Sequence, residues 1–129
     1  MSNPNYFVIP GRLPGLNEVL GASRASKYVG ARIKKETDDS ICWSIRRAMM
    51  EGHCRKAEGP VRLEIEWYET NRKRDLDNIF SGKKFILDAM QRMKILEGDG
   101  QKYVVGLRDD FCISHEAYIK VRIVAADED

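Results

Sequence analysis

The sequence has no long hydrophobic run. Its longest apolar stretch, 6–10, is much shorter than the roughly 20 residues that a membrane-spanning helix needs, and so is the run 85–87. The chain also lacks the pattern of a secretion signal, in which a positively charged start precedes an apolar segment and a small-residue cleavage site. We therefore expect a cytoplasmic protein that does not enter a membrane.

Cysteine and histidine are scarce. The three cysteines, Cys42, Cys54 and Cys112, lie 12 and 58 residues apart, which fits neither a disulfide framework nor a zinc ribbon. The two histidines, His53 and His115, have no second ligand at the spacing of a metal site. We expect buried or incidental thiols, and histidines with a structural or surface role.

A strong excess of one charge is also missing. The chain carries 22 basic and 20 acidic side chains, a net charge of +2, and three of the acids form the tail 127–129. A modest positive excess is compatible with nucleic acid but does not demand it. The composition, 43% hydrophobic and 33% charged, is that of a globular protein. The length predicts a single domain over 1–129, with a flexible acidic tail.

Hydrophobic periodicity predicts the secondary structure. Apolar residues at multiples of four indicate a long amphipathic helix over 27–51, with Ser26 as its N-cap and Gly52 as its stop. A second helix is expected over 78–93. Alternation of apolar and polar residues predicts strands at 61–68, 103–107 and 119–123, after a short first strand at 6–9.

The order of these elements predicts the fold class. The prolines and glycines of 10–15 indicate a loop, and 16–26 is expected to be irregular as well. The last two strands are expected to pair as a hairpin across 109–116. The sequence therefore predicts an α+β fold, a single domain with a mixed four-stranded sheet and two main helices.

A dense cluster of charges lies between the strand at 61–68 and the second helix. It reads Arg-Lys-Arg-Asp-Leu-Asp-Asn over 72–78. In an extended segment, side chains two residues apart point the same way, so Asp75 and Asp77 can converge on one ion while Leu76 turns toward the core. Two close carboxylates repel unless a cation lies between them. Because Mg²⁺ accepts oxygen ligands and can bridge to a phosphate, the cluster indicates a phosphodiester site.

The same cluster of charges is compatible with other roles. Either aspartate could instead cap the following helix by accepting backbone N–H bonds, and this alternative stays open. A calcium EF-hand loop starting at Asp75 is excluded, because Phe80 and Ile86 stand where glycine and glutamate are required. An aspartyl-phosphate site is disfavoured, because three cations at 72–74 precede the pair instead of an apolar strand.

Charged residues of the second predicted helix extend this site. Lys84 lies seven residues after Asp77, roughly 20° short of two helical turns, so both should project from one polar face, whereas Lys83 is rotated away. Lys84 could neutralise a phosphate. Asp88 shares this face but lies on the order of 16 Å along the axis from Asp77, so we expect it to support the site from a distance or to pair with Lys84.

Asp99 is the remaining acidic candidate. It lies between Gly98 and Gly100, just before the strand predicted at 103–107, with Lys102 beside the start of that strand. Glycines allow a ligand to approach the backbone closely, although they equally mark a plain turn.

Three separated elements in this order resemble the RusA-type Holliday junction resolvases, a family common in bacteriophages and prophages. They are Arg-Asp-Leu-Asp-Asn at 74–78, Lys-Phe-Ile-Leu-Asp-Ala-Met at 84–90, and Asp99. The resemblance covers about 61–124, with a looser echo in the proline- and asparagine-containing segment 9–17. The chain departs from the family pattern by about three extra residues between Asn78 and Lys84, and by Gly98, where an acidic residue is frequent.

The resemblance implies an activity and a set of residues. It implies that Asp75, Asp77 and Asp99 bind Mg²⁺, with Mn²⁺ as a possible substitute, and that Lys84 takes part in catalysis. The expected reaction is metal-assisted attack of water on a phosphodiester, resolving four-way DNA junctions by paired symmetric nicks in recombination and repair. A homodimer is implied because a four-way junction has two-fold symmetry. The candidates for contacts with the DNA backbone are Arg72, Lys73, Arg74 and Lys102, with Lys34 and Lys35 on the long helix.

Two other functions remain open at this point. The scaffold could serve as a non-catalytic module that binds branched DNA, with an affinity that a chelator does not change. The same site could also belong to a metal-dependent nuclease acting on RNA or on other nucleic acids.

Overall fold

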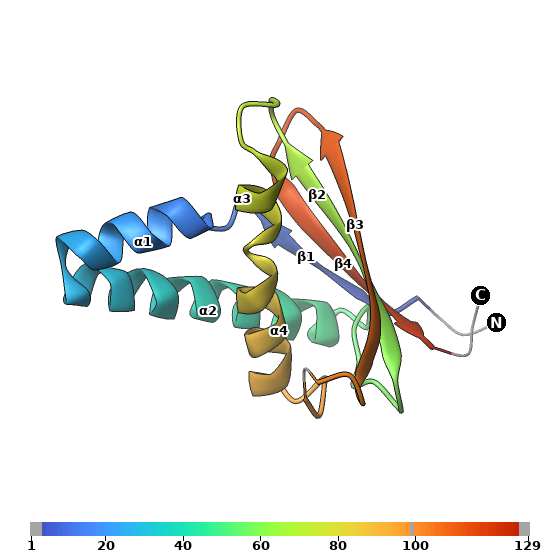
Figure 1. The fold of residues 1–129 in the computed structure, drawn as a ribbon. Helices are drawn as coiled ribbons and strands as arrows, with labels where there is room; N and C mark the ends of the chain where they lie inside the picture. The colour runs from blue at the N-terminus through green and yellow to red at the C-terminus, as the bar shows by residue number, and fades with distance from the viewer. Residues whose placement is uncertain (1–3, 99, 127–129) are drawn as a thin grey trace.

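In the part of the chain that the structure describes, four strands form one mixed sheet and four helices pack with it (Figure 1). The computed structural model describes residues 4–98 and 100–126. The sheet order is β1-β4-β2-β3. The strands are β1 (Tyr6–Pro10), β2 (Val61–Glu69), β3 (Val104–Ile113) and β4 (Tyr118–Ala125), and the helices are α1 (Leu16–Ala25), α2 (Lys27–Met50), α3 (Leu76–Phe80) and α4 (Lys83–Arg92). The predicted α+β domain with a mixed four-stranded sheet is thereby confirmed.

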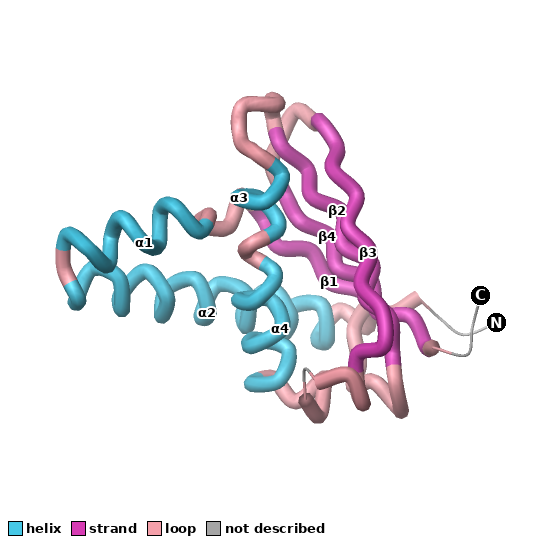
Figure 2. The backbone as a smooth tube through the Cα atoms, in the orientation of Figure 1, coloured by secondary structure: helices cyan, strands magenta, loops and turns pink. Residues whose placement is uncertain are grey.

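The strand β2 is the centre of the sheet and of the core. Its side chains alternate between buried and half-buried along all nine residues, as the period-two pattern predicts. The buried face of β2, with Leu63 and Trp67, packs with Val121 of β4 and with Ile41 and Ile86 of the helices. Figure 2 shows the helices on one side of the sheet, so this face of β2 is the covered one.

The helix α2 confirms the prediction for 27–51 almost to the residue. The side chain of Ser26 accepts a hydrogen bond from the backbone N–H of Val29 at 3.4 Å, as an N-cap should. The C-terminal half of α2 buries Ile41 and Ile45 in the core. Its N-terminal half packs with α1, and the two project together away from the sheet (Figure 1).

The prediction that 16–26 is irregular was wrong, because residues 16–25 form α1. The prolines and glycines that suggested a loop end at Gly15, and no proline interrupts the ten residues that follow. Gly30 of α2 lets the two helices approach closely, since a Cβ there would collide with Ser23 of α1. Packing against α2 thus stabilises a short helix that has a weak apolar pattern of its own.

The single helix predicted over 78–93 is divided into α3 and α4. The interruption falls at Ser81 and Gly82, among the extra residues that distinguish this chain from the family pattern. Gly82 is buried against Leu13, and a Cβ at this glycine would lie 3.1 Å from the leucine side chain. The N-terminal loop therefore occupies the space that a continuous, bulkier helix would need.

The expected hairpin across 109–116 was also wrong. The strand β3 pairs parallel with β2, whereas β4 pairs antiparallel with both β2 and β1, so β3 and β4 lie on opposite sides of β2. The helices α3 and α4 form the crossover from β2 to β3, and a helical crossover of this kind joins parallel strands. The strand also runs from Val104 to Ile113, well past the predicted end at 107. Its position leaves β3 as an edge strand of the sheet.

Within 4–98 and 100–126, no helix is both long enough and apolar enough to cross a membrane.

The three cysteines are free thiols, in agreement with the prediction. Cys54 lies in the core at 5% exposure, and Cys42 and Cys112 are half-buried. Burial raises the pKa of the Cys54 thiol from 9.0 to about 11, against the smaller opposing effects of the Arg55 charge and a backbone hydrogen bond.

This raised pKa predicts that the folded state loses stability at alkaline pH. Because the folded state holds the Cys54 proton more tightly than the unfolded chain does, the stabilisation is complete below pH 9 and is lost as the pH rises toward about 11. The expected slope from this group is up to about 1.4 kcal/mol per pH unit. Urea unfolding at pH 8 and pH 10.5 should show a larger loss for the wild type than for Cys54→Ala. Equal losses in both proteins would contradict the assignment.

Candidate active site at the end of the central strand

The charged motif lies where the chain leaves β2 and enters α3. The strands β2 and β3 are parallel, so this segment lies beyond their carboxyl ends, the common place for a ligand site in sheets with parallel crossovers. Asp75 is the N-cap residue of α3, with extended backbone angles of φ −66° and ψ 148°, and Asp77 lies in the first helical turn. Both side chains are exposed.

The expected geometry of the two aspartates needs correction. Only Asp75 is extended, because the chain becomes helical at Leu76 and places Asp77 inside α3. The two carboxylates therefore do not share a side through strand alternation. Leu76 does not turn toward the core either, since its side chain is 56% exposed and Ile79 is the buried residue of α3.

The structure does not support the alternative that the Asp75 side chain caps α3. Its side chain makes no capping hydrogen bond to α3. Asp77 accepts one hydrogen bond, from the backbone N–H of Asn78 to Oδ1 at 3.0 Å. Among the described residues, neither aspartate takes part in an ion pair, so both carboxylates have oxygen atoms available for a ligand.

Arg74, the residue before Asp75, forms a buried ion pair with Glu69. Arg74 donates from Nη1 to both carboxylate oxygens of Glu69 at 3.4 Å, and the two side chains are only 12% and 9% exposed. Arg74 also donates from Nη2 to the carbonyl oxygens of Leu13 and Asn78, at 3.3 and 3.5 Å. Its Nε is buried and has no hydrogen-bond partner in the described part of the chain. Arg74 was predicted as a DNA contact, and the structure places it as a tether between the N-terminal loop, β2 and α3.

Sequence reasoning missed Glu69, although a signal for it exists. The buried positions of β2 are the odd ones, and Glu69 continues that series as its last member. A charge on the buried face at the end of a strand requires a partner, since an unpaired buried charge is strongly unfavourable. Arg74 and, at 3.8 Å, Arg12 supply the opposite charge.

Asn78 joins the motif to the N-terminal loop. Its side-chain oxygen accepts a hydrogen bond from the backbone N–H of Asn17 at 3.4 Å. Gly15 is needed for this approach, because a Cβ at that position would collide with the Asn78 amide. The segment 9–17, which has a weaker similarity to the family, thus lies against the motif in space.

A cleft of about 540 Å³ opens beside Asp75. It lies between the β2–α3 connection and the end of β3, and it combines charged and apolar walls. The charged lining comes from Glu69, Arg72, Arg74 and Asp75, and the apolar lining includes Phe111 and Ile113 of β3. The cleft therefore brings a carboxylate and cations together at one opening.

The other predicted cations lie at different places. Arg72 and Lys73 are exposed in the loop before Asp75. Lys84 is exposed on α4 and pairs with Asp88 at 2.8 Å, which confirms the expected i,i+4 pair. Lys102 is exposed near the opposite end of the sheet, with its Nζ 5.6 Å from the centre of the Tyr103 ring.

Lys83, which was predicted to be rotated away from the site, makes the more buried contact of the two neighbouring lysines. Its Nζ lies 2.5 Å from Oδ2 of Asp109 on β3, and the two side chains are 15% and 18% exposed. The indole N–H of Trp67 donates to the other oxygen of Asp109 at 2.8 Å. Sequence reasoning missed Asp109, because its partners become neighbours only through the parallel pairing of β2 and β3.

Asp99 lies outside the described residues, so its predicted place in the site stays a prediction. Its described neighbour Gly100 accepts a hydrogen bond from the N–H of Tyr103, whose carbonyl oxygen accepts one from Val61 at the start of β2. Asp75 follows the other end of β2, and nine residues of strand span roughly 26 Å. Within one chain, Gly100 thus lies near the start of β2 and Asp75 beyond its end, at opposite ends of the sheet.

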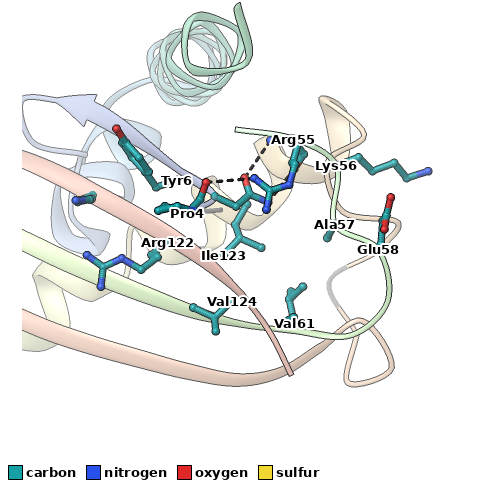
Figure 3. A pocket seen from close by; sticks show the side chains of 13 residues that line it. Pro4, Tyr6, Arg55, Lys56, Ala57, Glu58, Val61, Arg122, Ile123 and Val124 are labelled. Carbon is teal, nitrogen blue, oxygen red and sulfur yellow. Dashed lines mark hydrogen bonds between the residues drawn. The ribbon is translucent and has the colours of Figure 1, made fainter. Parts of the chain in front are cut away.

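A wider hollow than the cleft beside Asp75 lies elsewhere on the described part of the chain. It has a volume of about 670 Å³ and lies where β2 begins and β4 ends (Figure 3). Cations dominate its charged lining, namely Arg55, Lys56, Lys120 and Arg122. We place the candidate site at the smaller cleft, because that cleft carries the chemistry of the motif.

Within 4–98 and 100–126, no three or more histidine, cysteine, aspartate or glutamate side chains are grouped to hold a metal ion. Neither a protein-family model nor a curated protein matches this chain. The resemblance to the resolvases therefore rests on the motif residues themselves.

The two adjacent lysines give a matched test of the α4–β3 contact. Lys83→Met should lower the free energy of unfolding by about 1–3 kcal/mol, because it leaves the half-buried Asp109 carboxylate without its charged partner. Lys84→Met should change it by less than about 1 kcal/mol, since its pair with Asp88 is exposed. Urea denaturation at constant salt measures both, and equal effects would contradict the distinction.

Proposed function

We propose that this protein is a metal-dependent endodeoxyribonuclease of the RusA type that acts on branched DNA. The observation that carries the proposal is the position of Asp75 and Asp77. They are exposed carboxylates without ion-pair partners among the described residues, and both follow the carboxyl end of β2. Asp75 lines a cleft whose other charged walls are Glu69, Arg72 and Arg74. Carboxylates left unneutralised among fixed positive charges are typical of sites that bind a metal ion together with a phosphate.

The residues present fit a hard divalent cation. Mg²⁺ commonly keeps several waters and is bound through one or two carboxylates together with substrate phosphate oxygens, which two exposed aspartates can supply. When bound, Mg²⁺ or Mn²⁺ would stabilise the charge that develops on the phosphate and favour attack by water. Asp75 and Asp77 would hold the ion. The resemblance proposes Asp99 as a third ligand, and because Gly100 and Asp75 lie at opposite ends of the sheet within one chain, Asp99 would have to come from the second copy of the proposed homodimer.

The other residues of the motif have separate proposed roles. Arg72 and Lys73 are exposed before Asp75, so their side chains can reach phosphates of a bound strand. Arg74 positions the loop through Glu69 and the carbonyl oxygens of Leu13 and Asn78. Lys84 lies on α4 after the interruption at Gly82, and we propose that it contacts DNA or the reacting phosphate from there.

The proposal extends to the assembly and its setting. A homodimer that resolves four-way junctions by two symmetric nicks follows from the two-fold symmetry of such junctions. Recombination and repair in the cytoplasm, or during phage growth, would be the setting. Lys34 and Lys35 are exposed on the projecting part of α2, and Lys102 is exposed at the far end of the sheet, so these lysines could contact the arms of a junction.

Substitution of the aspartates tests the catalytic claim. The wild type with Mg²⁺ should nick a synthetic four-way junction symmetrically. Asp75→Asn and Asp77→Asn should each lower the cleavage rate by about 100-fold or more while junction binding persists, because each removes a charged oxygen ligand. Asp39→Asn, a change of the same kind at an exposed position of α2, should leave the rate unchanged.

The outcomes separate the remaining possibilities. Absence of any Mg²⁺-dependent cleavage of junctions, flaps or duplexes by the wild type would overturn the proposal. Junction binding that neither EDTA nor Asp75→Asn alters would favour the non-catalytic binding module. Cleavage of RNA in preference to a competing junction would favour the broader nuclease.

A further inference from the structure

The hollow at the start of β2 and the end of β4 gathers positive charge outside the candidate site (Figure 3). Four cations and one acid, Glu58, line it, so its charged lining is strongly positive. Figure 3 shows Lys56 on one side, Arg122 on the other and Arg55 between them. A concave surface lined by charges of one sign concentrates ions of the opposite sign. The hollow therefore favours an anionic ligand.

Buried hydrogen bonds fix the wall of the hollow that carries Arg55. The side chain of Asn5, which is 6% exposed, accepts from the backbone N–H of Arg55 and donates to its carbonyl oxygen, both at 3.0 Å. The N–H of Ile123 in β4 donates to the carbonyl oxygen of Asn5 at 2.7 Å, and the N–H of Tyr6 donates to that of His53 at 2.9 Å. The wall is thus held to β1 and β4 before a ligand arrives, which lowers the entropic cost of binding.

Two lysines of the lining keep their charge available for a ligand. Lys120 makes no ion pair with a described carboxylate, and its Nζ lies 4.8 Å from the centre of the Tyr6 ring. Lys56 is 60% exposed and lies 3.8 Å from the Glu97 carboxylate, a contact that contributes little in water. A bound anion would therefore replace only weak contacts when it engages Lys56 and Lys120.

Carboxylates border the positive hollow on both of these sides. On the sheet, the carboxylates of Glu64 and Glu66 lie 3.5 and 3.8 Å from the Arg122 guanidinium. On the other side, the Glu97 carboxylate lies beside Lys56. Surfaces that bind a nucleic-acid strand extend their positive charge along the path of the backbone, whereas this charge ends within one hollow. A compact anion suits it better than a continuous strand.

The hollow also has apolar walls and the volume of a small-molecule site. Val61 and Val124 line it across from Arg55 (Figure 3). Its volume of about 670 Å³ lies within the range of roughly 300–1,000 Å³ that is usual for ligand pockets. A ligand that joins phosphate groups to a planar, largely apolar ring would contact both kinds of wall. Nucleotides have this chemistry.

We propose that this hollow binds a free nucleotide, with its phosphates against Lys56 and Lys120 and its base against the apolar walls. The site is separate from the cleft beside Asp75, because it lies at the start of β2 and Asp75 follows the end of that strand. The inference stands on the hollow itself and does not depend on nuclease activity.

Calorimetric titration with ADP in the presence of EDTA tests the site apart from any bound metal. The wild type should bind ADP with a Kd below about 1 mM. The double variant Lys56→Gln, Lys120→Gln should weaken binding by about tenfold or more, because it removes two charged donors to the phosphates. Lys27→Gln, Lys94→Gln is the matched control, since both lysines are exposed and neither lines the hollow. This control should leave the Kd unchanged.

Circular dichroism spectra that match the wild type establish that both double variants are folded. Absence of ADP binding up to about 5 mM, or equal affinities of the two double variants, would overturn the proposal. Inorganic tripolyphosphate should bind more weakly than ADP, because it lacks the base, and equal affinity would overturn the contact with the apolar walls. If the Lys56→Gln, Lys120→Gln variant loses affinity for duplex DNA while the wild type does not bind ADP, the hollow belongs to a DNA-binding surface and the proposal fails.

Discussion

The buried ion pair between Arg74 and Glu69 determines where the motif of this chain lies. Glu69 ends the buried face of β2, and the guanidinium that neutralises it also donates to carbonyl oxygens of the N-terminal loop and of α3. Three segments that are distant in sequence are thereby held at one end of the sheet. Removing either charge would leave the other buried without its partner, which is far more costly than never burying the pair.

Local patterns in the sequence were sufficient to predict β2 and α2. The alternation along β2 and the four-residue spacing along α2 each depend on one face of one element meeting the core. The partner of β3 could not be predicted in this way, because strand pairing depends on the crossover that precedes β3 and not on its own alternation. The helix α1 was missed because its packing against α2, through Gly30, stabilises it more than its own sequence does.

The proposed ligands of the candidate site could be named from the sequence, whereas the residues that support them could not. Asp75, Asp77 and the cations before them form a contiguous motif, so they were identified from spacing alone. The roles of Glu69 and Asp109 follow from their ion pairs with Arg74 and Lys83, which form only in the fold. The interruption at Gly82 changed which lysine of α4 faces β3. A helix continued through 81–82 would have kept a fixed angle between Asp77 and Lys84, and two separate helices have no such constraint. Prediction therefore failed where tertiary contacts decide the side-chain direction.

The parallel pairing of β2 with β3 determines both where the motif lies and which strand is at the edge of the sheet. The crossover that makes the strands parallel places the motif at their carboxyl ends, and it also leaves β3 at the edge of the sheet. Phe111 and Ile113 line the cleft beside Asp75 and also belong to the exposed edge. The apolar wall of the candidate site therefore comes from the strand that has β2 as its one neighbour in the described sheet.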